Sequence, residues 1–137
     1  MTTNETAVST TSVTALYARQ SHAIDNGDAA VWAGTFTPDG SFSSPTFGDP
    51  IVGTEALTRF AEGVYADLQA EGVRQRHWLN SVDVDTPAST ARAYLMIVRV
   101  DAEGTPSLLR HVVITDDLAV TDTGELRVRA RQVRRDP

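Results

Sequence analysis

Four stretches in the second half of the chain decide the fold. They read VRQRHWLNSVDVD (73–85), TARAYLMIVRVD (90–101), SLLRHVVITDDLAV (107–120) and ELRVRARQVR (125–134). Each is rich in β-branched residues, which favour strands, and turn-forming residues such as proline and glycine separate them. The pattern predicts four long strands joined by short connections, as in an antiparallel meander.

The first half of the chain carries helical spacing instead. From about residue 9 to residue 26, apolar residues recur every three or four positions, and Gly27 ends the pattern. A short second helix is expected around Trp32 and a third from Thr54, with a short strand over residues 41–47. Helices first and strands later predict an α+β fold, in which three N-terminal helices pack on one side of a curved antiparallel sheet.

The composition is typical of one globular domain. The chain has 137 residues, of which 41% are hydrophobic, so we expect a single domain over residues 1–137 with residues 1–8 as a flexible terminus. The net charge of -6 argues against nucleic-acid binding. No apolar run approaches the ~20 residues of a membrane span, and the N-terminus lacks the features of a signal peptide. We therefore expect a cytoplasmic protein with no nucleic-acid and no membrane partner.

Missing residue types exclude several chemistries. The sequence contains no cysteine and no lysine, so it has no thiolate nucleophile, cysteine metal site or Schiff-base lysine. Its three histidines lack the close spacing typical of zinc ligands, and we expect no metal and no cofactor. Arg127, Arg129 and Arg131 alternate along the last predicted strand, which we interpret as a solvated outer face rather than an anion site.

Two of the predicted strands are apolar on both faces, at residues 95–98 and 112–114. Strands with one buried face alternate, so these two need a cover on each side. The helices cover one face of the sheet. A second subunit is expected on the other, which makes a homodimer the predicted assembly.

The histidines are the candidates for proton transfer. His22 lies off the apolar stripe of the first helix and is interpreted as a surface residue. His77 and His111 lie in separate predicted strands, and a curved sheet can aim both into one concavity. Imidazole transfers protons near neutral pH, and a carboxylate partner fixes its tautomer. Asp25, at the end of the first helix, is the predicted partner of His111; the alternative is that Asp25 only ends the helix and the histidines are core residues.

A second group of residues is predicted to contact a substrate. Alternation along the strand places His111 on one face together with Leu109 and Val113. The predicted orienting groups are Tyr94, Gln20 and Ser44, and the predicted wall residues are Trp32, Phe47, Phe60, Trp78 and Met96. Core packing explains each wall residue equally well.

The chain resembles the NTF2-like superfamily and, within it, the SnoaL-like polyketide cyclases. The segments that carry the resemblance are AIDNGD (23–28), AGTFTPDG (33–40), FSSP (42–45), GTEAL (53–57) and RHWLN (76–80). The likeness runs from about residue 10 to residue 135 and implies a cone of helices and curved sheet. This fold hosts cyclases, isomerases, dehydratases and non-catalytic binding domains, so it leaves the reaction open.

Two groups of this superfamily suggest roles for single residues. Ketosteroid isomerases carry a tyrosine and an aspartate base where this chain has Gln20 and Ser44, and serine cannot act as a carboxylate base. The chain is more similar to scytalone dehydratases, whose paired aspartate and histidine match Asp25 and His111 and whose second histidine matches His77, although their two tyrosines are missing. This resemblance implies that Asp25, His77 and His111 share one pocket.

The expected function is therefore a cofactor-independent acid/base enzyme, a cyclase, dehydratase or isomerase, acting on a small apolar polyketide-type metabolite. His111, oriented by Asp25, would remove a proton, and His77 would protonate the acceptor oxygen. The main alternative is a non-catalytic module of the same fold that binds a small ligand or serves as a dimeric accessory subunit. A small subunit of a larger oxygenase is a third interpretation.

Overall fold

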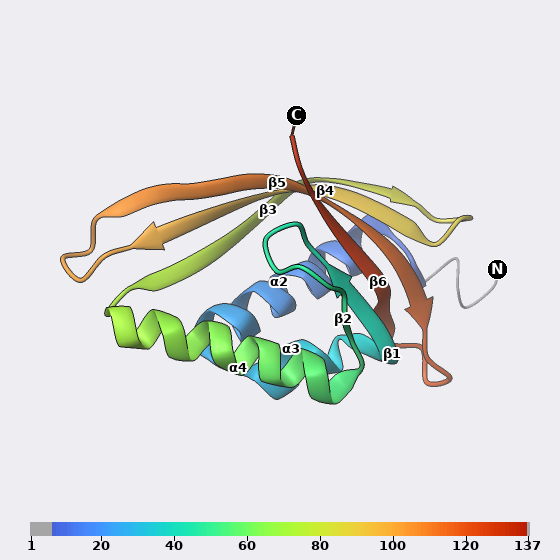
Figure 1. The fold of residues 1–137 in the computed structure, drawn as a ribbon. Coiled ribbons are helices and arrows are strands. Elements are labelled where there is room, and N and C mark those ends of the chain that lie inside the picture. Colours follow the sequence, from blue (N-terminus) through green and yellow to red (C-terminus); the bar gives the residue numbers. More distant parts are fainter. Residues whose placement is uncertain (1–6, 137) are drawn as a thin grey trace.

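Three helices lie beneath a curved six-stranded sheet in the computed structural model, which describes residues 7–136 (Figure 1). The helices are α2 (Thr10–Asn26), α3 (Ala29–Gly34) and α4 (Thr54–Glu71). The strands are β1 (Phe36–Ser43), β2 (Ile51–Val52), β3 (Arg74–Asp85), β4 (Thr90–Val100), β5 (Pro106–Val120) and β6 (Leu126–Arg135), in the sheet order β2-β1-β6-β5-β4-β3. The predicted α+β class, with helices on one side of a curved sheet, is confirmed.

The long strands pair as the sequence predicts. β3, β4, β5 and β6 form an antiparallel meander, while β1 pairs in parallel with β6. β1 begins at Phe36, earlier than the predicted residue 41, and its register on β6 shifts between Phe36 and Ser41. Gly40 permits this irregularity, since a Cβ atom there would lie 2.9 Å from the Cβ atom of Phe36.

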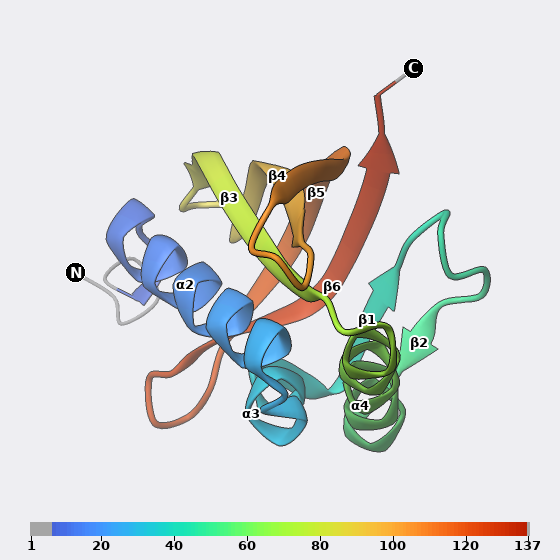
Figure 2. The same cartoon turned by 90° about the vertical axis from the view of Figure 1, so that its left-hand side faces the viewer.

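The end of α2 is fixed by one glycine. Gly27 has a φ of 85°, and a Cβ atom there would lie 2.8 Å from Cε2 of Tyr65 on α4. Only glycine combines this left-handed backbone with so close an approach. The helix therefore stops directly after Asn26, which leaves Asp25 in its last turn. Figure 2 shows α2 running beneath β3 and α4 beneath the β1–β2 pair.

Part of the predicted flexible terminus, residues 1–8, lies outside the described residues. Val8 is described and fully buried, and its carbonyl oxygen accepts a hydrogen bond of 2.9 Å from the Thr86 hydroxyl. The packed structure therefore begins earlier than predicted.

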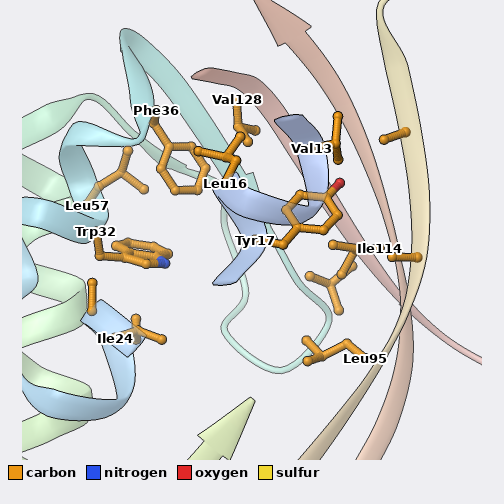
Figure 3. Packing of buried hydrophobic residues seen from close by; sticks show 14 of the residues in the cluster. Val13, Leu16, Tyr17, Ile24, Trp32, Phe36, Leu57, Leu95, Ile114 and Val128 are labelled. Carbon is orange, nitrogen blue, oxygen red and sulfur yellow. The ribbon is translucent and has the colours of Figure 1, made fainter. Parts of the chain in front are cut away.

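The core fills the space between the helices and the concave face of the sheet. Figure 3 shows side chains from both layers: Val13, Leu16, Tyr17 and Ile24 of α2, Trp32 of α3, Leu57 of α4, and Phe36, Leu95, Ile114 and Val128 of the sheet. On the opposite face of the sheet, no helix of residues 7–136 is packed (Figure 1). Trp78 and Tyr94 are exposed. The homodimer expected to cover this face stays a prediction. Within residues 7–136, no helix is long and apolar enough to cross a bilayer.

Candidate active site

A cavity of about 320 Å³ lies between the helices and the concave face of the sheet. One wall is aromatic, because Phe60 packs against Trp32, Phe42 and Phe47 with ring centroids 5.8, 5.3 and 4.9 Å apart. The sheet supplies an aliphatic wall of Leu79, Leu95, Ile97 and Val112. This size and this apolar lining suit a small organic molecule.

Asp25 and His77 form a hydrogen-bonded pair; His77 lines this cavity, and both residues border a neighbouring groove along α2 and β3. Oδ1 of Asp25 lies 2.6 Å from Nδ1 of His77, and Oδ2 accepts a 3.0 Å bond from the backbone N–H of the same residue. The side chains are 6% and 18% exposed, and the imidazole lines the cavity. A carboxylate that accepts from Nδ1 favours the tautomer with its proton on that nitrogen, and in the neutral form of this tautomer Nε2 carries the lone pair.

The pairing follows from the position of β3 at the edge of the sheet. A backbone N–H of an edge strand that points away from the sheet has no strand partner. α2 packs along β3, and the last turn of α2 brings the Asp25 carboxylate to the N–H of His77. The Asp25 carboxylate thus accepts a hydrogen bond from the free backbone N–H of His77 and also holds the imidazole ring of the same residue.

The predicted pair of Asp25 and His111 is wrong. His111 pairs with Met96 in the β4–β5 register, whereas its neighbours Arg110 and Val112 line the cavity. Since side chains alternate along a strand, His111 points out of the opposite face. Its side chain is 41% exposed, and its Nδ1 lies 3.1 Å from Oδ2 of Asp136.

Three predicted substrate contacts share that outer face. Trp78, Met96 and His111 are opposite one another across three strands, and Tyr94 lies in the next outward position of β4. Tyr94 and Trp78 are 53% and 61% exposed. None of these four side chains lines the cavity, so the structure does not bring them together with the Asp25–His77 pair there. Trp78 instead borders a groove along α2 and β3.

Leu109 also departs from simple alternation, because it lies on the cavity side of the sheet and not on the outer face with His111. The β4–β5 register shifts between Ile97 and Val98, whose partners are Arg110 and Leu108. Leu109 is the unpaired extra residue of this bulge, and it lines the cavity instead of sharing a face with His111.

The remaining predicted contacts do lie at the cavity. Gln20, Ser44, Trp32, Phe47 and Phe60 all line it. Gln20 is held at both ends of its amide: the oxygen accepts from Arg131 at 2.7 Å and the nitrogen donates to the Thr35 hydroxyl at 2.9 Å. The Gln20 amide therefore links Arg131 to Thr35 by hydrogen bonds.

A buried ion pair behind Gln20 was not predicted. Arg131 donates from Nε and Nη2 to the two oxygens of Asp116 at 2.9 and 2.8 Å, and the Tyr17 hydroxyl donates to Oδ2 of Asp116 at 2.7 Å. The expected outer face for Arg131 is wrong, because the β5–β6 register passes from Ala130 to Val128 and leaves Arg129 as an extra residue. This bulge turns Arg131 inward.

The network shifts the acidity of its members. Burial, together with the negative charge of Asp116, raises the pKa of Tyr17 far above its ordinary value of 10.0. Burial alone would lower the pKa of Arg131, but Asp116 outweighs it and the pKa rises. Tyr17 therefore stays a neutral donor and Arg131 a cation across the physiological range.

The raised pKa of Tyr17 predicts a loss of stability in alkali. Above about pH 10 the unfolded chain releases the tyrosine proton while the folded protein keeps it, so the free energy of unfolding falls by up to ~1.4 kcal/mol per pH unit from this residue. A Tyr17→Phe variant is expected to be less stable at pH 7 by about 1–3 kcal/mol, since Asp116 loses a donor, but to decline less steeply above pH 10. Urea unfolding between pH 7 and pH 11 checks this; parallel declines would contradict it.

Comparisons with known proteins agree with this fold. A family model described as a SnoaL-like domain matches residues 5–132. The protein Aln2 from a Streptomyces species is 28% identical, with a TM-score of 0.80 over 90% of this chain and 88% of that one. A protein from Catenulispora acidiphila, solved in complex with S-DNPA, is 30% identical, with a TM-score of 0.74 over 88% of each chain.

A third solved structure supports the fold alone. It is an NTF2-like protein with a cystatin-like fold from Novosphingobium aromaticivorans, 22% identical, with a TM-score of 0.74 over 91% of this chain and 88% of that one. The comparison with curated proteins finds no match.

Proposed function

Because the chain belongs to the SnoaL-like family, we propose that it is an acid/base enzyme that acts without a cofactor on a small, largely apolar metabolite of the polyketide type. The reaction class is cyclisation, dehydration or isomerisation. The observation that carries this proposal is the buried Asp25–His77 pair, whose imidazole lines an apolar cavity.

In this proposal His77 moves the proton. Its Nε2 accepts a proton from a carbon next to a carbonyl, or from a hydroxyl group of the substrate. Asp25 holds the ring in the tautomer that leaves Nε2 free and stabilises the imidazolium that forms. The same imidazole then returns the proton to the product. Such a proton transfer contributes typically ~10²–10⁴-fold in rate.

The cavity supplies orientation. Its aromatic and aliphatic walls hold a flat or folded apolar molecule in one position, which favours an intramolecular step. Ser44 is 8% exposed, and its hydroxyl accepts a 3.3 Å bond from the backbone N–H of Thr46. That hydroxyl keeps its own proton for a substrate oxygen.

The test uses 2-tetralone, a bicyclic ketone with exchangeable hydrogens next to its carbonyl. We expect the protein, dialysed against EDTA, to accelerate replacement of these hydrogens by deuterium in heavy water, as followed by NMR. Acceleration by wild-type protein supports the enzyme. Binding of 2-tetralone without any acceleration would favour the non-catalytic binding module instead.

A further inference from the structure

The guanidinium of Arg131, at the cavity, keeps one nitrogen, Nη1, that has no hydrogen-bond partner among residues 7–136. Arg131 is 7% exposed and lines the cavity, and its Nε and Nη2 are occupied by Asp116 and Gln20. Nη1 donates to no residue within 7–136, yet it is not among the buried polar atoms that lack a partner, which are Arg99 Nε and Thr115 Oγ1 in that range. Nη1 therefore keeps some exposed surface, and the residue that carries it lines the cavity.

The guanidinium is rigidly held. Its central carbon lies 5.3 Å from the ring centroid of Tyr17 and 5.8 Å from that of Phe36. Asp116, which is fully buried, fixes the orientation of the guanidinium group by accepting two hydrogen bonds from it. A donor held in place before the substrate arrives needs no reorganisation during the reaction, which makes it effective at stabilising a developing charge.

The other charged side chains at the cavity are not held by a buried carboxylate as Arg131 is. Arg110 donates to the Thr46 hydroxyl at 3.0 Å, and Arg99 forms an ion pair with Glu71. Asp67 also lines the cavity and is exposed. Of the three cavity-lining arginines among residues 7–136, Arg131 is the one with only 7% exposure, and it is also the one held by a buried carboxylate.

We propose that Nη1 of Arg131 binds the substrate oxygen on which negative charge develops, so that the natural substrate carries a carbonyl or phenolic oxygen conjugated to the reacting carbon. His77 takes the proton from that carbon, the C–H electron pair becomes the enolate double bond, and the carbonyl π pair moves to the oxygen. Arg131 donates a hydrogen bond to this oxyanion without giving up its proton. When the proton returns from His77, the charge on the oxygen disappears.

The reaction step rests on the proposed function, but oxyanion binding can be measured without turnover. The probe is 4-nitrophenol, whose phenolate is seen by its absorbance, and the matched probe nitrobenzene lacks the acidic oxygen. In wild-type protein we expect the pKa of bound 4-nitrophenol to fall by about one unit or more, which means that phenolate binds at least ~10-fold tighter than phenol. In Arg131→Met this fall is lost, while nitrobenzene binds within about two-fold of wild type.

Two further variants keep the test decisive. Arg131→Met leaves the Asp116 carboxylate buried without its cation, so a double variant without either charge, Asp116→Asn with Arg131→Gln, is measured beside it. This double variant is also expected to lose the fall in the pKa of bound 4-nitrophenol. Arg110→Gln, which removes another cavity-lining cation, is expected to keep it. The inference is overturned if wild-type protein does not bind the phenolate more tightly than the phenol. It is also overturned if the fall in the pKa of 4-nitrophenol is lost in Arg110→Gln but kept in the Arg131 variants. Accelerated exchange of 2-tetralone without a phenolate preference would leave the proposed function standing and remove only the role of Arg131.

Discussion

Replacing Asp116 by alanine is expected to lower the free energy of unfolding by about 3–5 kcal/mol. Asp116 is fully buried and accepts hydrogen bonds from Arg131 and Tyr17. Without it the guanidinium keeps its charge in a largely buried site with no counter-ion, and the Tyr17 hydroxyl loses its acceptor. Breaking one side of a buried ion pair costs far more than the pair contributes as a whole.

The adjacent residue offers the control for this prediction. Asp117 is exposed on the same strand, and Asp117→Ala is expected to change stability by no more than about 0.5 kcal/mol. Replacing both charged partners with apolar residues, as in Asp116→Leu with Arg131→Met, should recover a large part of the loss. Urea unfolding at pH 7 measures all three. Equal effects of the Asp116 and Asp117 substitutions would show that the ion pair is not buried as described.

The second large effect concerns catalysis. His77→Gln is expected to slow the exchange of 2-tetralone hydrogens by about 10²–10⁴-fold, because glutamine has a similar polar reach but cannot accept a proton near neutral pH. Asp25→Asn should also slow it, since an amide no longer fixes the same tautomer or stabilises the imidazolium. Circular dichroism and nitrobenzene binding show whether each variant keeps its fold and cavity.

Much of the fold could be predicted from the sequence because its signals are local. Gly27 ends α2 where the helical spacing stops, and the β-branched stretches match β3 to β6 within a few residues. The predicted start of β1 at residue 41 is too late, because the Pro38–Gly40 segment is typical of a turn but forms an irregular part of the strand. Its pairing with β6 joins residues far apart in the chain, which no local pattern reveals.

The site could be predicted in part, and the errors have separate structural causes. Val112, Val113 and Ile114 are all apolar, so this stretch gives no sign of which face of β5 lies inside, and His111 was assigned to the wrong one. The bulge at Arg129 reversed the expected face of Arg131. Asp25 does hold a histidine, but that histidine is His77, because α2 runs along the edge strand β3 and not along β5.

The most direct measurement compares His77→Gln with His111→Gln in the same exchange assay. If His77, held by Asp25 at the cavity, is the group that moves the proton, then the first variant loses about 10²–10⁴-fold in rate and the second stays within about two-fold of wild type. A rate that survives the loss of His77, or that falls with the loss of His111 alone, would contradict the account.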